Sequence, residues 1–172
     1  MKVIALDTGK KNEYSWTKAF WNRNFGIELN KDIWTIANQV TKEVRLRELH
    51  WKIIHNIYPT NITLKKMNIR PSDKCCICPN ETDYIEHFFF FCDTISKFWK
   101  EIEILIFNKT QKSTRLGVKE ILFGYHGKEN KNIVNKVILL GKMCISIYRK
   151  TNMVTPLKIV FENHSMTRKI WD

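Results

Sequence analysis

The sequence predicts a mainly α-helical domain in which a short cysteine-rich segment is inserted between helices. Three observations lead to this fold class. Apolar residues recur at helical spacing on both sides of residues 75–92, the 172 residues include only six glycines and four prolines, and four of the five cysteines fall within 75–92. With 44% hydrophobic residues, the chain has enough apolar material to bury one core.

The first half of the chain contains four predicted helical segments. Residues 14–26 form a short helix that ends at its glycine, and Asn30 caps a second helix with an apolar stripe. The clearest helix covers 41–58, where apolar residues recur every three or four positions and Pro59 provides the stop. A short helical turn within 60–69 follows, and a loop then leads into the cysteines.

The second half is predicted to be helical as well. Residues 93–107 and 132–150 have wide apolar faces, and a last helix follows Pro156. Residues 108–117 form a polar linker, and the apolar run over 118–125 is too short to assign. The chain is accordingly divided into an N-terminal helical segment, a core of helix, cysteine segment and helix, and a C-terminal helical segment packed on that core: 1–41, 42–107 and 108–172.

The charge of the chain indicates its kind of partner. A formal net charge of +12 predicts an acidic partner, and nucleic acid is the commonest one. Ribosome-like and membrane-surface roles stay open on charge alone. The charge is also uneven, because residues 42–74 carry a net +5 whereas residues 75–107 carry a net −4. The cysteine-rich segment is therefore the acidic part of a basic protein.

Cysteine number and hydropathy indicate the compartment. The start of the chain, "MKVIALD", lacks the charged region and long apolar run of a secretory signal, and no apolar run approaches the length of a membrane span. An odd set of cysteines without such a signal favours free thiols over disulfides. We therefore expect a reduced, nuclear or cytoplasmic protein that is not secreted, with no membrane partner and no small-molecule substrate.

The spacing of four residues in the cysteine-rich segment predicts a metal site. Cys75 and Cys78 are separated by two residues, which lets two thiolates take neighbouring corners of a tetrahedron. If Cys76 replaced Cys75 as a ligand, only one residue would separate the two thiolates. His87 and Cys92 complete the pattern C-x2-C-x8-H-x4-C. Three sulfurs and one nitrogen are typical of a closed structural Zn²⁺ site with no position for a catalytic water. We call residues 75–92 the knuckle.

The last two of these residues constrain the backbone between them. His87 and Cys92 are five positions apart, which places them about 140° apart on an ideal α-helix. The run "HFFFFC" therefore cannot be one regular helix, and a bend or an extended piece must intervene. Cys92 would then begin the helix at 93–107, where the positive end of the helix dipole favours a thiolate.

Other interpretations of the thiols stay open. Four thiols in a reduced protein can be buried hydrophobic residues, and Cys144, inside an apolar helix, is assigned to the core. A thioredoxin-like redox pair is disfavoured because no alternation of strand and helix surrounds the cysteines. A zinc deaminase would need a His-x-Glu before Pro-Cys-x-x-Cys, and here the order is reversed. Zinc is the favoured interpretation.

The stretch "LRELHWKIIHNIYPTNITLKKMNIRPSDKCCICPNETDYIEHFFFFCDTISKFWKEI" resembles a known family. It is similar to the reverse-transcriptase zinc-binding domain at the C-terminal end of the second open reading frame of LINE-type, non-LTR retrotransposons. The resemblance is tightest over residues 46–103, with looser similarity on both sides. The matching positions are His55, Pro59, Thr60, Asn61, Leu64, Cys75, Cys78, Glu81, Thr82, His87, Cys92 and Trp99.

The resemblance implies a module that binds the RNA of the element, or nucleic acid of the target site, and helps to seat it for target-primed reverse transcription. The chain has no polymerase stretch with paired aspartates and no endonuclease module. It is therefore expected to be a non-enzymatic fragment or remnant. RNA is the preferred partner, DNA the second, and other domains of the reverse transcriptase are further candidates. The alternative is a zinc-stapled protein-interaction domain within a polymerase polyprotein.

The predicted contacts to nucleic acid depend on charge alone. Three basic residues lie on the helix over 41–58 and four lie between that helix and the knuckle: Arg45, Arg47, Lys52, Lys65, Lys66, Arg70 and Lys74. A rival basic patch consists of Lys142, Arg149 and Lys150. Most of the four consecutive phenylalanines are assigned to the core, and an exposed ring beside His87 is the candidate for base stacking.

Overall fold

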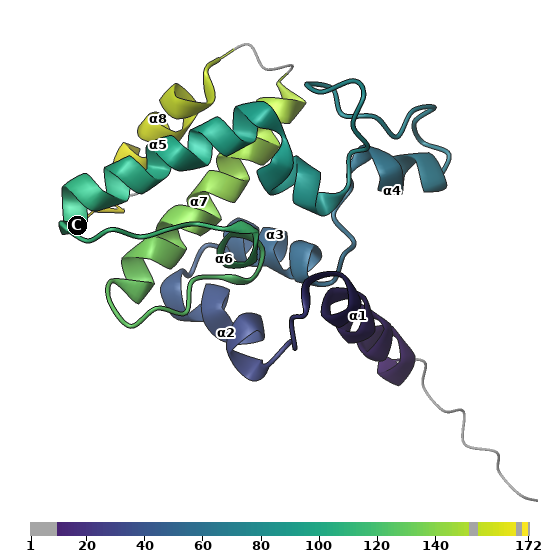
Figure 1. Ribbon diagram of the computed structural model, residues 1–172, viewed down its shortest axis with the longest axis horizontal. Helices are drawn as coiled ribbons and strands as arrows, with labels where there is room; N and C mark the ends of the chain where they lie inside the picture. Colours follow the sequence, from purple (N-terminus) through teal and green to yellow (C-terminus); the bar gives the residue numbers. More distant parts are fainter. Residues whose placement is uncertain (1–9, 152–154, 168–169, 172) are drawn as a thin grey trace, which may run out of the picture.

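The structure is a computed structural model that describes residues 10–151, 155–167 and 170–171 (Figure 1). The α-helices and one π-helical turn are α1 (Lys10–Phe25), α2 (Lys31–Val40), α3 (Val44–Ile54), α4 (Asn61–Lys66), η1 (His87–Phe91), α5 (Asp93–Thr110), α6 (Val118–Phe123), α7 (Lys131–Lys150) and α8 (Leu157–Thr167). Within these ranges no strand forms, and the one isolated antiparallel bridge joins Lys74 and Thr82. The predicted mainly α fold is confirmed.

Local signals explain where the first two helices begin and end. Gly26 follows α1 with φ of 61°, a left-handed conformation that glycine adopts without strain. The side chain of Asn30 accepts a hydrogen bond of 3.1 Å from the backbone N–H of Ile33, so it satisfies one free donor at the start of α2. The predicted end at Gly26 and the predicted cap at Asn30 are both confirmed.

The predicted helix over 41–58 is too long at its C-terminal end. Helix α3 ends at Ile54, and Asn56 adopts a left-handed φ of 56°. Asparagine tolerates this conformation and, like glycine, ends helices with it. The chain therefore leaves the helix before Pro59 is reached.

Three elements of the second half differ in detail from the prediction. Helix α5 continues to Thr110, three residues beyond 107, and ends where Gln111 becomes left-handed. The unassigned run over 118–125 contains α6, whose start is fixed by a hydrogen bond of 3.0 Å from the backbone N–H of Gly117 to the Glu120 carboxylate. Helix α7 begins one residue earlier than predicted, at Lys131.

Helix α7 runs through the centre of the fold. It packs against α2, α3 and α8, while α5 packs against η1 and α8, so the longest helix has neighbours on several sides (Figure 1). One apolar cluster contains Trp21 from α1, Ile53 from α3, Trp99 from α5 and Ile138 from α7. All three predicted segments thus contribute to one core, and the boundaries between them stay a prediction.

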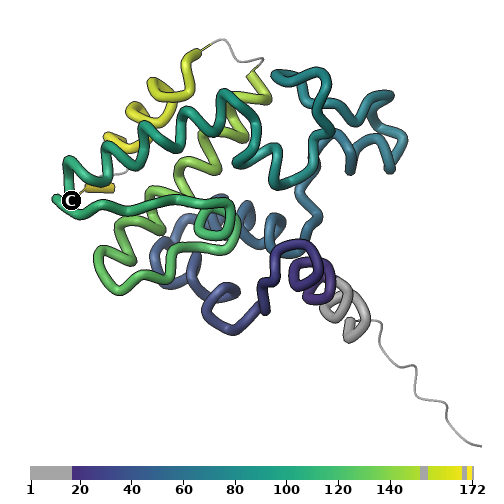
Figure 2. The backbone as a smooth tube through the Cα atoms, viewed as in Figure 1, coloured from purple at the N-terminus to yellow at the C-terminus, as the bar shows by residue number. Residues whose placement is uncertain are grey.

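The segment between α4 and η1 projects from this helical body (Figure 2). It carries the first two cysteines of the knuckle and returns to the body at η1. Among the described residues, no helix has the length and apolar character needed to span a bilayer.

Candidate metal centre

The structure brings four side chains of the knuckle together. The three sulfurs of Cys75, Cys78 and Cys92 and one imidazole nitrogen of His87 all lie within 4.8 Å of one another. The sulfurs of Cys78 and Cys92 are 3.6 Å apart, and all of these cysteines are free thiols. Two sulfurs bound to one tetrahedral zinc lie about 3.8 Å apart, given Zn–S bonds of about 2.3 Å. The cluster therefore has the dimensions of a site that could hold a metal ion.

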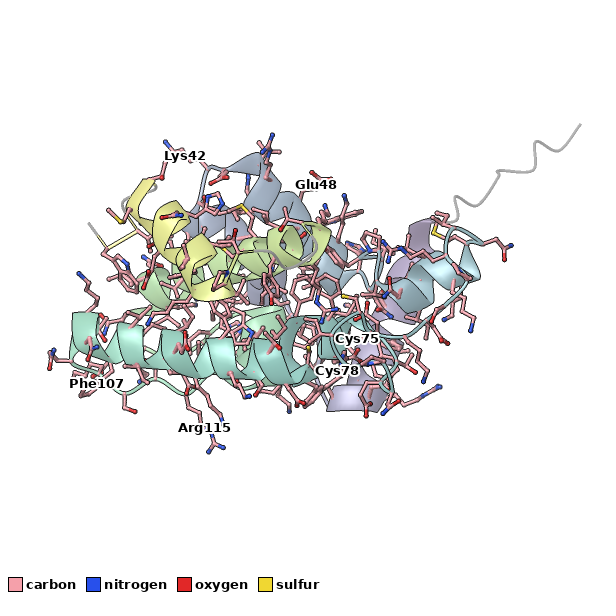
Figure 3. The ribbon with its side chains drawn as sticks, turned by 90° about the horizontal axis from the view of Figure 1, so that it is seen from above. Lys42, Glu48, Cys75, Cys78, Phe107 and Arg115 are labelled. Carbon is pink, nitrogen blue, oxygen red and sulfur yellow. The ribbon has the colours of Figure 1, made fainter. Side chains whose placement is uncertain are left out.

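A tight loop holds the first two cysteines. The backbone N–H of Cys75 donates to the carbonyl of Glu81 and the N–H of Glu81 donates to the carbonyl of Cys78, both at 2.9 Å. The N–H of Ile77 points at the Cys75 sulfur, 3.4 Å away. Figure 3 shows Cys75 and Cys78 close together, near the end of α5 that is opposite Phe107.

The other two donors come together because the backbone widens into a π-helical turn. In η1 the N–H of Cys92 donates to the carbonyl of His87 at 3.1 Å, a bond between residues five apart. Cys92 itself is extended, with φ of −60° and ψ of 131°, and it caps α5. The prediction that "HFFFFC" cannot be one regular helix is confirmed, and the irregularity is a π turn.

Burial shifts the pKa of two of the donors, Cys92 and His87. Burial raises the pKa of Cys92 to about 12, even though a backbone hydrogen bond from Ile95 at the start of α5 acts to lower it. The start of α5 thus lowers the pKa of Cys92 as expected, but burial raises it by more. Burial likewise lowers the pKa of His87, which favours the neutral imidazole that metals bind.

The imidazole of His87 also fits a metal. Its Nε2 atom is buried and has no hydrogen-bond partner among the described residues. A buried polar atom without a partner is costly, and a metal ion that accepts its lone pair would remove that cost. Three sulfurs with one such nitrogen form the donor set of a structural zinc site.

The sequence did not indicate that Arg149 would contact the residues of this centre. This residue lies in the last turn of α7, and its Nη1 atom donates to Asp83 at 2.9 Å and lies 3.5 Å from the Cys75 sulfur. Its guanidinium carbon sits 4.1 Å from the centre of the Phe88 ring. Asp83 and Arg149 are 66 residues apart, so no local pattern indicated that they would meet.

The remaining thiols and histidines lie outside the cluster. Cys76 is exposed, and Cys144 is buried in α7, as predicted for a core residue. His50 is buried, and its Nε2 atom donates a hydrogen bond of 3.1 Å to the carbonyl of Ile33. None of these groups is within the cluster of four donors.

The predicted stacking ring is in a different place. Phe88, directly beside His87, is only 7% exposed and lies under Arg149. Phe89 is fully buried, so the prediction that most of these rings belong to the core is confirmed for this pair. The exposed ring is Phe91, which is 54% exposed and precedes Cys92.

The structure groups only some of the predicted nucleic-acid contacts. Arg45 and Lys52 line one hollow together with Lys150, and Arg70 lines a second hollow together with Arg149 and Lys150. One residue of the rival patch does not belong on a surface, because Lys142 is fully buried. Of the other two, Lys150 lines both hollows and the buried Arg149 lines the hollow of Arg70, so the two predicted patches meet.

The other four residues predicted to contact nucleic acid do not line these two hollows. Arg47 lines a different hollow, with its Nη1 atom 3.5 Å from the Asn38 amide oxygen, and Lys65 forms an ion pair of 3.2 Å with Asp73. The Lys74 ammonium donates to the carbonyl of Asn80 at 3.1 Å. Lys66 lines a further hollow, beside Glu86.

One comparison with known proteins identifies a family. The family of domains described as zinc-binding in reverse transcriptase matches residues 5–99, which is more than half of the chain and includes all four donors. No curated protein and no solved structure matches the chain. The family is a zinc-binding accessory domain rather than a catalytic one. The chain therefore belongs to the family of reverse-transcriptase zinc-binding domains.

Proposed function

We propose that Cys75, Cys78, His87 and Cys92 hold one Zn²⁺ ion, which fixes the shape of the knuckle. The observation that carries this proposal is the convergence of three sulfurs and one imidazole nitrogen of His87 within 4.8 Å, together with a buried Nε2 atom of that ring that has no hydrogen-bond partner among the described residues. A structural zinc site of this kind contributes roughly 10 to 16 kcal/mol of binding free energy at neutral pH. That is comparable with or larger than the roughly 5 to 15 kcal/mol that stabilises an ordinary domain, so the knuckle depends on the metal.

The zinc-loaded chain is proposed to act as a non-catalytic nucleic-acid-binding module of a LINE-type, non-LTR reverse transcriptase. The net charge of +12 supports an anionic partner, and the family match supports a reverse-transcriptase context. RNA is the first candidate and DNA the second, inside the nucleus or the cytoplasm. The metal supplies structure: with four protein donors, no coordination position remains for a substrate.

The test uses two cysteine variants of the full chain. Cys78→Ser removes a donor and should lower the zinc content below one ion per chain and weaken binding to a fluorescein-labelled single-stranded RNA. Cys76→Ser changes an exposed residue outside the donor cluster and should leave the zinc content unchanged. Elemental analysis gives the zinc content and fluorescence anisotropy gives the affinity. Identical behaviour of the two variants would refute the ligand assignment.

Salt dependence tests the nucleic-acid part separately. If about five phosphates are neutralised, the logarithm of affinity should fall with the logarithm of salt concentration with a slope near −3.5. A zinc-loaded chain that binds the RNA equally well at all salt concentrations, or does not bind it, would contradict a surface that reads the phosphate backbone.

A second candidate function is docking to another domain of the reverse transcriptase. A hollow of about 310 Å³ between α2 and α3 is lined by Trp34, Val44 and Trp51, and the last two are 64% and 47% exposed. Exposed apolar residues around a hollow are typical of protein-docking sites. If this hollow docks the polymerase domain, Trp51→Ala should weaken binding to that domain, as measured by calorimetry, without changing the affinity for RNA.

A further inference from the structure

Two adjoining hollows lie where α7 ends against α3, α4 and the knuckle. One, of about 280 Å³, is lined by Asn61, Arg70, Cys76, Asp83, Arg149 and Lys150 among others. The second, of about 350 Å³, is lined by Arg45, Lys52 and again Lys150. Pro59 also lines both hollows, so they are neighbours on one surface. We call this surface the Lys150 track.

The charge of the Lys150 track is strongly basic. Five cations line it, and the two carboxylates that line it are both engaged: Asp83 pairs with Arg149 at 2.9 Å, and Glu48 pairs with Lys52 at 2.6 Å. Among the described residues, neither Arg45 nor Lys150 has a carboxylate within ion-pair distance. A surface with an excess of positive charge along one path is suited to a polyanion.

The floor of the first hollow carries the strongest indication of a ligand. The side chain of Arg149 is 4% exposed, and its Nη1 atom is used by Asp83. Its Nε and Nη2 atoms are buried and have no hydrogen-bond partner among the described residues. Buried guanidinium N–H groups without acceptors are costly, and an anionic oxygen accepts two such groups at once.

The rim of the same hollow adds further donors. Arg70 is exposed, and its Nη1 atom donates to the amide oxygen of Asn61 at 3.2 Å, which holds the guanidinium at the edge. Lys150 is exposed at the boundary with the second hollow. The arrangement is thus one buried arginine with exposed cations around it, spread over two adjoining hollows.

From these observations we infer that the Lys150 track binds consecutive phosphodiester groups of a single strand of RNA, with Arg149 as its buried anchor. This inference rests on the proposed nucleic-acid-binding function and locates it. It joins the predicted contacts Arg45, Lys52 and Arg70 to the end of α7, which lies beyond the residues that the family match covers. It also explains why the knuckle and the end of α7 are tied together, because each supplies part of one surface.

The test compares two double variants that remove the same charge. Arg70→Gln with Lys150→Gln changes two exposed residues of the track. Lys109→Gln with Arg115→Gln changes two exposed residues, one in the last turn of α5 and one in the loop that follows, and Figure 3 shows Arg115 away from Cys75 and Cys78. With zinc-loaded full chain and a fluorescein-labelled 12-nucleotide single-stranded RNA, the track variant should bind about tenfold more weakly, with a salt slope shallower by about 1.4. The control variant should bind within about twofold of the unmodified chain.

The outcomes separate this inference from the proposed function. Equal loss of affinity in the two double variants, or none in the track variant, would overturn the Lys150 track while RNA binding by the unmodified chain stands. Absence of RNA binding by the zinc-loaded unmodified chain would instead overturn the proposed function. Zinc content measured for each variant should equal that of the unmodified chain, since none of the four residues belongs to the donor cluster.

A footprint gives an independent readout of the same surface. Cys76 is exposed, lines the first hollow and is outside the donor cluster. In zinc-loaded protein it should be the thiol that reacts first with N-ethylmaleimide, and saturating RNA should slow its alkylation at least severalfold, as measured by mass spectrometry. An unchanged rate of alkylation at saturating RNA would contradict a strand in the track.

Discussion

At the scale of single residues, Asp83 joins three parts of the chain. One carboxylate oxygen accepts from Arg149 at 2.9 Å and the other accepts from the backbone N–H of Asn61 at 3.1 Å. The side chains of Asp83 and Arg149 are only 2% and 4% exposed. The pair therefore connects the knuckle with the start of α4 and with the last turn of α7, inside the protein.

Removing one partner of this pair should be costly. Asp83→Asn leaves the buried guanidinium without its counter-charge, and losing one partner of a buried ion pair costs about 3 to 5 kcal/mol of unfolding free energy. Urea unfolding of the zinc-loaded chain measures the loss. Glu48→Gln is the matched control, since its partner Lys52 is in solvent and the change should not shift the urea midpoint. Equal midpoints for the two variants would show that the Asp83 pair contributes nothing.

At the scale of elements, α5 and α7 approach closely at Gly141. A methyl group on this residue would lie 2.5 Å from the Trp99 ring, which is shorter than atoms tolerate. Trp99 has little freedom to move, because it is 1% exposed and its Nε1 atom donates to the carbonyl of Phe89 at 2.7 Å. The glycine in the middle of α7 thus sets the distance between the two helices and supports η1.

Gly141→Ala tests this packing. Overpacking a core costs about 1 to 3 kcal/mol, whereas alanine gains about 1 kcal/mol over glycine in a helix, so a net loss of up to about 2 kcal/mol is expected in urea unfolding. Trp99→Phe shortens the ring that is in the way. The double variant should therefore lose less stability than the two single losses added together. If the losses of unfolding free energy in the two single variants added up to that of the double variant, the Trp99 ring would not be what restricts the side chain at position 141.

The elements also show what local sequence can predict. Gly26 and Asn30 act through bonds to their own neighbours, so their effects were predictable from the sequence. The stop at Asn56 was missed because Pro59, three residues later, is the stronger signal, although the left-handed conformation of Asn56 ends the helix first. The π turn was predicted only as an irregularity, since spacing shows that His87 and Cys92 cannot share a regular helix but not how the backbone widens.

At the scale of the whole molecule, the candidate centre was predictable and its surroundings were not. The four donors lie within eighteen positions, and their spacing alone indicates tetrahedral coordination. Arg149 and Lys150 reach the same region only because α7 crosses the core and ends there. Charge alone placed Lys142 with them, yet one helix has an exposed and a buried face, and Lys142 lies on the buried one.

Lys142 connects four helices inside the core. Its ammonium nitrogen lies 3.1 Å from the Nδ1 atom of His50 on α3 and donates to the carbonyl of Leu122 on α6 at 3.1 Å, while the Nε2 atom of His50 faces the carbonyl of Ile33 on α2. Burial lowers the pKa of Lys142 from 10.5 to about 7. Burial, together with the nearby Lys142, lowers the pKa of His50 from 6.5 to about 3.

These shifts make the stability of the whole molecule depend on pH. Between pH 7 and 10.5 the unfolded chain keeps a proton on Lys142 that the folded chain has released, so the free energy of unfolding should rise with pH across this window. The free energy of unfolding should likewise fall as pH drops from 6.5 towards 3, because in this window the unfolded chain protonates His50 and the folded chain does not.

Lys142→Met should flatten the rise in the free energy of unfolding above pH 7, as measured by urea unfolding of the zinc-loaded chain at several pH values. Lys136→Met is the control: Lys136 is on the same helix but partly exposed, so this variant should retain the rise above pH 7. A rise that survives in Lys142→Met would show that other groups produce it.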